Sequence, residues 1–173
     1  MNIHLIRHAE AIERSDAVTD EHRYLTQRGR SRFRNVAVSF KKLVGELDLI
    51  MSSPLVRAVQ TADILAEKLR YEGEFLVSSE LAPGFSTRRL RDILASLPGA
   101  AEIALVGHEP DLGEVTRELL GTDSSCTLKK GSVAAFALDA GKASKSPEFL
   151  WLITGSGKVI DDRAKALERL QGE

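Results

Sequence analysis

Short apolar segments alternate along the chain with longer stretches in which apolar residues recur every three or four positions. The short segments have the length and the continuous hydrophobicity of buried strands, and the longer stretches have the spacing of helices with one buried face. Strands and helices in alternation are typical of a doubly wound α/β sheet. The strands are expected at 3–6, 49–51, 75–77, 103–106, 132–138 and 149–153.

Local signals mark where several helices between these strands begin. Thr26 can cap the first helix. The apolar residues of this helix are Phe33, Val36, Ala37, Phe40, Leu43, Val44 and Leu47. Ser53 as N-cap and Pro54 at the first helical position are expected to open the next helix, which runs to about Leu69. Further helices are expected at about 87–97, 110–120 and 161–171.

The expected fold is a three-layer α/β/α arrangement around a mostly parallel sheet of about six strands, in a single domain that spans residues 1–173. The strands at 132–138 and 149–153 are joined by a polar turn from Asp139 to Pro147, and we expect them to form an antiparallel pair at the edge. A chain of 173 residues can bury roughly 70% of its unfolded surface in one core.

Composition and charge restrict the class of partner. The net charge of −1 gives no overall attraction for nucleic acid or a membrane, so any attraction for a phosphorylated partner must be local. Cys126 is the only cysteine, which excludes an internal disulfide and suits a reducing compartment. Arg7, His8 and Glu10 stand where a signal peptide would be apolar, and no run approaches the ~20 apolar residues that span a bilayer. We therefore expect a cytoplasmic protein that binds neither nucleic acid nor membranes.

Candidate chemical residues follow three of the expected strands. Arg7 and His8 come directly after the first strand, and His108 follows the strand 103–106 after a single glycine. Arg57 lies on the first turn of the helix after the strand 49–51. Ligands bind at the carboxyl ends of the strands in such sheets, so these side chains can converge on one crevice. Two histidines and two arginines there would form a cationic pocket for a tetrahedral anion.

Four short motifs, in register, resemble those of the histidine phosphatase superfamily. They are Arg7-His8-Ala9, Arg23-Tyr24-Leu25-Thr26-Gln27-Arg28-Gly29, Ser52-Ser53-Pro54-Leu55-Val56-Arg57-Ala58-Val59-Gln60-Thr61 and Gly107-His108. The resemblance extends from Asn2 to about Leu120, and residues 130–133 show a weaker similarity. By its small size the chain is most similar to the SixA branch, the phosphohistidine phosphatases that act on signalling proteins. This resemblance implies a phosphoglycerate mutase-like fold and a phosphatase that needs no metal or other cofactor.

Phosphoryl transfer requires positive donors around the three equatorial oxygens and one nucleophile in line with the leaving group. His8 suits the axial position: a neutral ring nitrogen would attack phosphorus, and water would then hydrolyse the resulting phosphohistidine. Arg7, Arg57 and His108 suit the equatorial positions. The two arginines should also disfavour a protonated His8 and so keep it nucleophilic.

Two further residues are expected to contribute to substrate binding. Arg23, by its match to the family segment, would clamp the phosphate or the substrate. Ser53 would contribute a hydroxyl or only cap its helix, and capping is the favoured role. The other two histidines are expected to lie outside the chemistry, His4 as a structural residue of the first strand and His22 at the surface beside Arg23.

The position of the general acid distinguishes substrate classes within the superfamily. Members that cleave phosphate monoesters usually place a glutamate two residues after a leucine in the loop after the third strand, but here Leu81 is followed at that position by Pro83. Glu80 is the nearest carboxyl and a possible acid. An imidazole leaving group needs less help than an alkoxide, which favours a phosphohistidine-bearing signalling protein as substrate. A small phosphomonoester, with Glu80 or Glu10 as the acid, is the alternative.

Other classes of function fit less well. A metal hydrolase that uses His8, Glu10, His108 and Glu109 lacks a known ligand spacing, and arginines in the pocket would repel a divalent cation. The segment 155–158 is no P-loop, because that motif needs Gly at 152 and Ser or Thr at 159.

A noncatalytic phosphoprotein-binding domain or a nucleic-acid binder is the remaining non-enzyme alternative. The basic residues of the first helix scatter over more than one face, as on a solvated exterior. They are Arg28, Arg30, Arg32, Arg34, Lys41 and Lys42. A mere binder has no need of an axial nucleophile, so His8 and His108 favour the enzyme. Lys129 and Lys130 either lie near the substrate entrance or only solubilise a loop.

Overall fold

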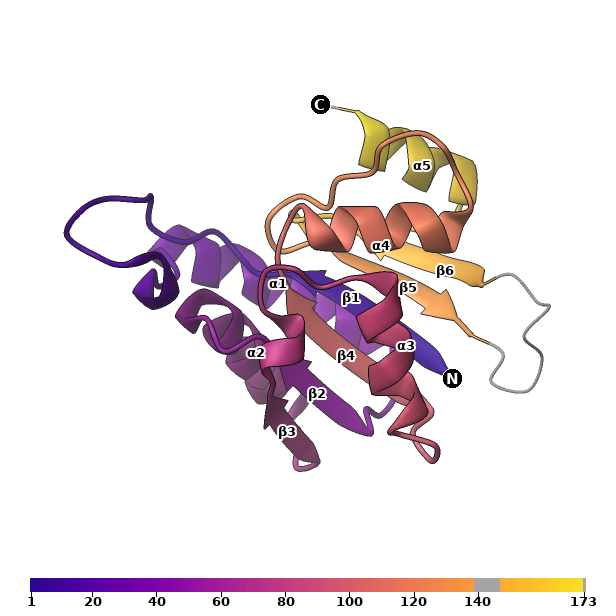
Figure 1. Cartoon of the computed structure of the whole chain (residues 1–173), viewed down its shortest axis with the longest axis horizontal. Coiled ribbons are helices and arrows are strands. Elements are labelled where there is room, and N and C mark those ends of the chain that lie inside the picture. Colours follow the sequence, from indigo (N-terminus) through magenta and orange to yellow (C-terminus); the bar gives the residue numbers. More distant parts are fainter. Residues whose placement is uncertain (139–146, 173) are drawn as a thin grey trace.

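The computed structural model describes residues 1–138 and 147–172, which form one sheet with helices on both faces (Figure 1). The strands lie in the order β3-β2-β4-β1-β5-β6-β7. Their bounds are Asn2–Arg7 for β1, Leu49–Ser52 for β2, Glu74–Val77 for β3, Glu102–Gly107 for β4, Val133–Ala137 for β5, Glu148–Ile153 for β6 and Val159–Ile160 for β7. The expected polar turn from 139 lies outside the described residues, apart from Pro147.

The sheet has a parallel half and an antiparallel half that meet at β1. β1 pairs in parallel with β4, β4 with β2 and β2 with β3, whereas β5, β6 and β7 pair antiparallel in succession from the other side of β1. The three-layer class is confirmed, but the parallel arrangement is limited to the first four strands. The expected edge pair also needs correction: β5 lies beside β1 inside the sheet, and the edge is β7, which has too few residues to give a periodic signal.

Within the described residues, four α-helices and two short 3-10 turns lie between these strands, and a fifth α-helix follows the last strand. They are α1 (Gln27–Leu43), α2 (Val56–Leu69), α3 (Thr87–Ala95), α4 (Asp111–Leu120), α5 (Arg163–Gln171), η1 (Asp20–His22) and η2 (Ser79–Leu81). Thr26 caps α1 as predicted, since its hydroxyl accepts a hydrogen bond from the Gly29 amide at 2.9 Å. None of the five is both long enough and apolar enough to cross a bilayer.

The predicted start of α2 is wrong. The helix begins at Val56 with Leu55 at the N-cap position, so Ser53 and Pro54 precede it in extended or turn backbone. The Ser53 hydroxyl accepts from the Leu55 amide at 3.3 Å, a local turn contact rather than a helix cap. The same hydroxyl contacts the ring of His108, and this tertiary contact determines the position of Ser53.

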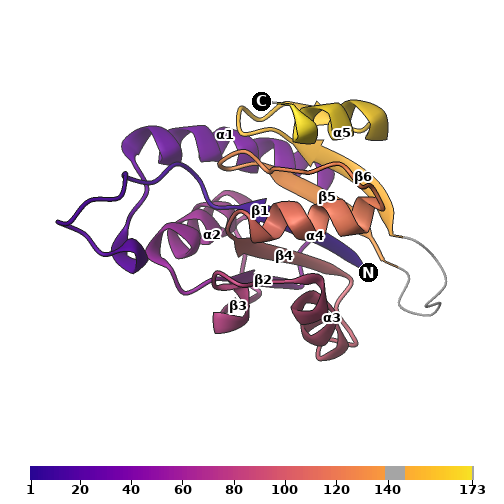
Figure 2. The same ribbon diagram turned by 45° about the horizontal axis from the view of Figure 1, so that its top comes forward.

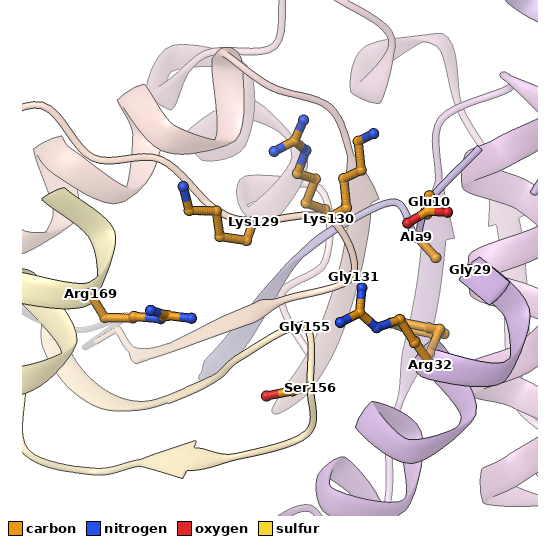
Figure 3. A pocket seen from close by; sticks show the side chains of 12 residues that line it. Ala9, Glu10, Gly29, Arg32, Lys129, Lys130, Gly131, Gly155, Ser156 and Arg169 are labelled. Atoms are coloured by element: carbon orange, nitrogen blue, oxygen red, sulfur yellow. The ribbon is translucent and has the colours of Figure 1, made fainter. Parts of the chain in front are cut away.

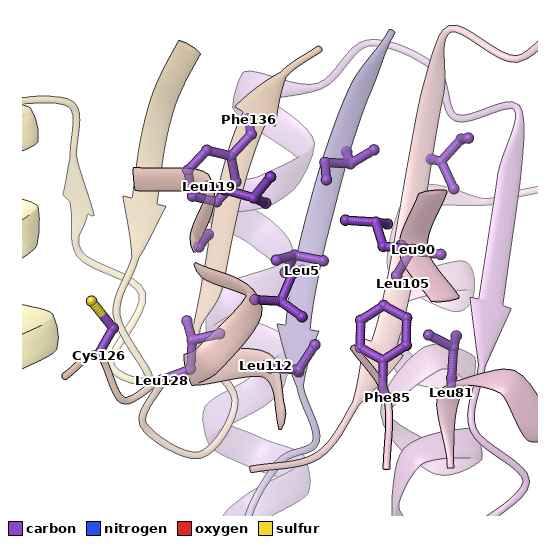
Figure 4. Packing of buried hydrophobic residues seen from close by; sticks show 14 of the residues in the cluster. Leu5, Leu81, Phe85, Leu90, Leu105, Leu112, Leu119, Cys126, Leu128 and Phe136 are labelled. Atoms are coloured by element: carbon purple, nitrogen blue, oxygen red, sulfur yellow. The ribbon is translucent and has the colours of Figure 1, made fainter. Parts of the chain in front are cut away.

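Each face of the sheet buries its own apolar layer. α1 and α2 cover one face, and α3, α4 and α5 cover the other (Figure 2). Figure 4 shows the second layer, in which Leu5 and Leu105 from the sheet meet Leu112 of α4 and Leu128. Ile6, the next residue along β1, joins the layer under α1 and α2 instead, as strand alternation requires.

His4 belongs to the layer under α1 and is a structural residue. It is 1% exposed, its Nε2 lies 2.7 Å from a carboxylate oxygen of Glu102, and its ring stacks on Trp151 at a centroid distance of 5.3 Å. The edge of Phe40 closes the cluster at 5.0 Å. A histidine enclosed in this way packs the middle of β1 against its neighbours. The candidate catalytic residues lie at the end of the strand instead.

Candidate active site

The predicted catalytic residues meet at the carboxyl ends of three neighbouring strands. His8 follows β1, Ser53 follows β2 and His108 follows β4. Backbone hydrogen bonds fix this edge, because the His8 amide donates to the Gly107 carbonyl at 3.1 Å and the Ser53 amide donates to the Val106 carbonyl at 2.9 Å. Side chains far apart in the sequence therefore lie in one crevice, where ligands bind in open α/β sheets.

The imidazole of His8 is buried and held in one tautomer. The residue is 8% exposed, and its Nδ1 lies 2.7 Å from the carbonyl oxygen of Ala9. A carbonyl can only accept, so Nδ1 carries the proton and Nε2 keeps its lone pair. Burial, and to a lesser extent the charges of His108, Arg57 and Arg7, lower the pKa of His8 to about 3. His8 is therefore neutral near pH 7, and Nε2 is unprotonated.

Arg57 is the nearest cation to that nitrogen. Its Nε donates to Nε2 of His8 at 3.2 Å, and the residue is only 5% exposed. The first turn of α2 is tied to the end of β1 through Thr61, whose hydroxyl donates to the Arg57 carbonyl at 2.7 Å and accepts from the Ala9 amide at 3.0 Å. This contact sets the guanidinium against the imidazole. Arg57 is thus no surface ion-pair partner but a buried member of the site.

Asp20 is a member of the site that the sequence analysis missed. It accepts two hydrogen bonds from Arg57, at 2.6 Å to its backbone oxygen and 3.1 Å to Oδ2. Its Oδ1 accepts from Arg23 at 2.9 Å and from Arg14 at 3.2 Å. The hydrogen bond from Arg23, followed by those from Arg57 and Arg14, holds the pKa of this carboxyl well below its usual range. A single carboxylate on η1 therefore holds the buried Arg57 and the mostly buried Arg23 together, and it also contacts the exposed Arg14.

Arg23 reaches the crevice through that carboxylate. Its Nε donates to the Ile12 carbonyl at 2.8 Å, which fixes the guanidinium beside the loop that precedes η1. His22, its neighbour in the sequence, is exposed, and its Nδ1 lies 2.6 Å from the Thr19 hydroxyl. The structure therefore brings Arg23 near the predicted site and leaves His22 at the surface.

His108 faces His8 across the crevice. The two ring centroids are 5.2 Å apart, and Nε2 of His108 lies 2.7 Å from the Ser53 hydroxyl. Burial, followed by the charge of Arg57, lowers the pKa of His108 to about 4. Its Nδ1 is buried with no hydrogen-bond partner among the described residues. Ser53 thus contacts a catalytic candidate directly, although capping was its favoured role.

Arg7 lies on the other side of β1 from His8. Its Nη1 donates to the Leu128 carbonyl at 2.6 Å, and its Nε is buried with no hydrogen-bond partner in the described part of the chain. The Arg7 charge still lowers the pKa of both His8 and His108, although it is not the largest cause for either. Arg7 therefore contributes to the field of the crevice from its far wall.

The structure does not bring the expected acid into contact with these residues. Glu80 is exposed on η2, where its amide donates to the Ser78 hydroxyl at 3.2 Å, and its carboxylate makes no hydrogen bond or ion pair within residues 1–138 and 147–172. Glu10 accepts from the Thr26 hydroxyl at 3.2 Å and lies 3.7 Å from Arg28. Neither carboxylate hydrogen-bonds to a histidine of the crevice within the residues described.

A different carboxyl, Glu109, lies next to His108 in the sequence. Its Oε1 accepts from the Leu128 amide at 2.9 Å, while the carbonyl of the same Leu128 accepts from Arg7. Burial raises the pKa of Glu109 to about 7. The sequence analysis considered Glu109 only as a metal ligand. Residues 1–138 and 147–172 contain no group of three or more His, Cys, Asp or Glu side chains arranged for a metal.

Taken together, the crevice offers a neutral imidazole nitrogen surrounded by fixed positive charge. Nε2 of His8 can attack an electrophile, and the guanidinium of Arg57 beside it can stabilise negative charge on the group attacked. His108 and Ser53 supply further polar atoms on the opposite wall. This combination suits transfer of a small oxyanion such as a phosphoryl group.

Comparison with known proteins agrees with this chemistry. Residues 3–82 match the sequence profile of the histidine phosphatase superfamily, branch 1. An uncharacterized protein of Picosynechococcus is 35% identical over 77% of this chain and 82% of its own length. The phosphohistidine phosphatase SixA of Escherichia coli is 27% identical over 80% of this chain and 86% of its own.

A solved structure gives the same result at the level of the fold. The protein histidine phosphatase SixA, in complex with tungstate, superposes with a TM-score of 0.78 at 25% identity, over 90% of this chain and 97% of that one. The sequence relatives and this structural neighbour support a phosphatase. The chain therefore belongs to the histidine phosphatase superfamily and is of the SixA type.

Proposed function

We propose that this protein hydrolyses phosphohistidine on a partner protein, through a covalent phosphohistidine at His8. The observation that carries the proposal is the state of His8: Nδ1 is committed to the Ala9 carbonyl, and Nε2 is unprotonated beside Arg57. A nucleophile must present a lone pair at working pH, and a pKa of about 3 provides it. The sequence predicted His8 as the nucleophile and Arg7, Arg57 and His108 as donors to the equatorial oxygens, and these roles remain a proposal here.

No general acid has to supply a proton if the substrate imidazole leaves as a neutral ring. His8 Nε2 forms a bond to phosphorus while the bond from phosphorus to the substrate ring nitrogen breaks. A substrate ring already protonated on its second nitrogen leaves as neutral imidazole, and His8 keeps its Nδ1 proton on the Ala9 carbonyl throughout. Water then attacks phosphorus, inorganic phosphate leaves, and Nε2 regains its lone pair. Arg57 stabilises the equatorial oxygens in both steps.

The carboxyl groups near the crevice support a phosphohistidine over an alkyl phosphate. An alkoxide needs a proton from a positioned acid, yet Glu80 is exposed and Glu10 is engaged with Thr26 and Arg28. Glu109 is directed to the Leu128 amide. The relatives support the same assignment, because the Escherichia coli protein is a phosphohistidine phosphatase and a related SixA structure holds tungstate, a tetrahedral oxyanion.

Two measurements test the proposal. Rapid quenching during turnover of a phosphohistidine protein should trap phosphate on His8 in a form that survives alkali and is lost in acid, and His8→Ala should abolish both trapping and turnover. In parallel, turnover should be compared between that protein and a panel of alkyl phosphates. Absence of a trapped phosphate while His8→Ala remains active would exclude the mechanism, and a clear preference for alkyl phosphates would make the protein a small-molecule phosphomonoesterase.

A further inference from the structure

A basic pocket of about 360 Å³ lies beside the crevice, where Arg7 and Ala9 at the end of β1 form part of its lining (Figure 3). Five basic side chains line it, from four separate parts of the chain. They are Arg7, Arg32, Lys129, Lys130 and Arg169. Figure 3 shows Arg32 of α1 and Arg169 of α5 extending toward the hollow from opposite sides, with Lys129 and Lys130 along its rim.

The pocket is continuous with the site through the backbone around His8. Arg7 and Ala9, the residues on either side of His8, both line the pocket. Gly131, also in the lining, donates its amide to the carbonyl oxygens of Arg7 at 3.2 Å and His8 at 3.1 Å. A group bound in the pocket would therefore lie close to a phosphoryl group at His8.

The positive charge of the pocket is not neutralised locally. Among residues 1–138 and 147–172, none of the five basic side chains has a carboxylate within 4.0 Å. The lining has one acidic residue, Glu10, which already contacts Thr26 and Arg28. Because the whole chain has a net charge of only −1, this concentration of charge is local and selects for an anionic ligand.

We infer that this pocket binds acidic side chains of the partner protein, adjacent to its phosphohistidine. The inference rests on the proposed function and adds the chemistry of the partner surface. Lys129 and Lys130, whose role the sequence left open, would then belong to the substrate entrance. Asp and Glu residues flanking the phosphohistidine would meet the basic pocket when the phosphoryl group reaches Nε2 of His8.

The form of the pocket favours a protein surface over a second compact phosphate. Compact phosphates are typically held by convergent backbone amides or at a helix N-terminus. Here the Gly131 amide is already bonded to Arg7 and His8, and the Gly157 amide in the adjacent turn is bonded to Thr154 at 2.8 Å. The charges instead sit on long, exposed side chains such as Arg32, Lys129 and Arg169, which suit the rim of a protein interface and steer association.

The test is a triple charge reversal, Arg32→Glu with Lys129→Glu and Lys130→Glu. Its substrate is a phosphohistidine protein with Asp and Glu beside the modified histidine, and the small molecule phosphoramidate serves for comparison. We expect kcat/KM for the protein to fall about tenfold or more at low salt, with the loss shrinking as salt is added. Turnover of phosphoramidate should stay within about twofold, because the nucleophile and Arg57 are untouched.

The matched control is Arg34→Glu with Lys42→Glu and Arg91→Glu. These three residues are exposed and lie outside the pocket lining, and their reversal changes the net charge by the same amount. The control should keep kcat/KM for the protein within about threefold of the wild type, so that any larger loss belongs to the pocket and not to overall charge.

The outcomes separate the two proposals. Equal kcat/KM for the wild type and both triple variants would overturn the basic pocket as a partner site and leave the proposed function standing. Competitive inhibition by inorganic pyrophosphate that disappears in the pocket variant would make the pocket a site for small polyanions, which also overturns the inference. If wild-type protein turns over neither phosphohistidine substrate nor phosphoramidate, the proposed function fails and the inference falls with it.

Discussion

Asp20 and Arg57 join a partly exposed carboxylate to a buried guanidinium: Nη2 of the guanidinium donates to Oδ2 of the carboxylate at 3.1 Å, and Nη1 donates to the Asp20 carbonyl at 2.6 Å. The third nitrogen of the guanidinium, Nε, donates to Nε2 of His8. A bound phosphoryl group needs donors of the same kind, so the carboxylate of Asp20 competes with the substrate for Arg57.

Replacing Asp20 with asparagine should therefore strengthen binding of inorganic phosphate or tungstate. The amide keeps one oxygen, which can accept from Arg57 or from Arg23 but not from both, and it removes the negative charge that competes with the anion for Arg57. We expect a gain of roughly 1 kcal/mol, or about fivefold in affinity, at low salt. Inhibition constants for both anions measure it, with Glu21→Gln, an exposed carboxyl next in the sequence, as the control. Weaker anion binding by Asp20→Asn would instead make Asp20 a positioning residue for the arginines.

Loss of Arg57 should remove charge stabilisation in the transition state. By analogy with removal of one oxyanion donor, Arg57→Ala should lower kcat by about 10²–10³-fold. Arg57→Lys should recover little, because an ammonium group cannot contact His8 and two phosphate oxygens in a fixed planar geometry. Lys68→Ala, an exposed position on the same helix, is the matched control. Near-normal activity of a folded Arg57→Ala would place this arginine outside the chemistry.

Glu80→Gln should leave turnover of a phosphohistidine protein almost unchanged. The side chain is exposed on η2, and the imidazole leaving group needs no acid. A true general acid contributes about 10²–10⁴-fold, so steady-state rates distinguish the two cases easily. Abolished turnover in this variant, together with efficient cleavage of alkyl phosphates, would identify Glu80 as the acid and remove the argument for phosphohistidine.

The two histidines of the crevice should not titrate between pH 5 and 8. Their pKa values fall from an ordinary 6.5 to about 3 for His8 and about 4 for His108. The unfolded chain takes up protons below pH 6.5 that the folded protein does not, so their contribution to stability is complete above pH 6.5 and is lost as the pH falls. Ring chemical shifts followed by NMR test this directly, and a titration near pH 6.5 for either ring would contradict it.

Glu109 should have the opposite effect on stability. Its pKa rises from 4.5 to about 7 in the folded protein, so the folded state holds a proton that the unfolded state has lost between these values. The contribution of Glu109 to stability is therefore complete below pH 4.5 and is lost as the pH rises from 4.5 through 7. Glu109→Gln keeps an oxygen for the Leu128 amide and should remove this loss. The free energy of unfolding in urea, measured at pH 5 and 8 for the wild type and for Glu109→Gln, tests this prediction. An equal pH dependence in the two proteins would contradict it.

The sequence predicted the strand ends well because each is marked by a local pattern. An apolar run followed by Arg7-His8 or Gly107-His108 specifies both a buried strand and the residues that leave it. The structure places both histidines in one crevice, at a centroid distance of 5.2 Å. Their convergence follows from parallel pairing of β1 with β4, which the alternation of elements already implied.

Features that depend on contact between distant segments were not predictable. Asp20 lies in a polar loop whose sequence gives no sign that it reaches Arg57 of α2. The start of α2 was predicted wrongly for a related reason. Ser53 and Pro54 match the pattern of a helix N-terminus, but the Ser53 hydroxyl contacts His108. Glu109 likewise becomes distinctive only once burial changes its acidity.

The meeting of two half-sheets at β1 affects how binding and chemistry are divided along the chain. His8, His108 and Arg57 come from the parallel half, while Lys129, Lys130 and Arg169 of the basic pocket come from segments near the antiparallel half. The exposed side chains of Lys129 and Lys130 can therefore be replaced while His8 keeps its contacts with Ala9 and Arg57. Under the two proposals, partner recognition can be altered by substitution separately from phosphoryl transfer.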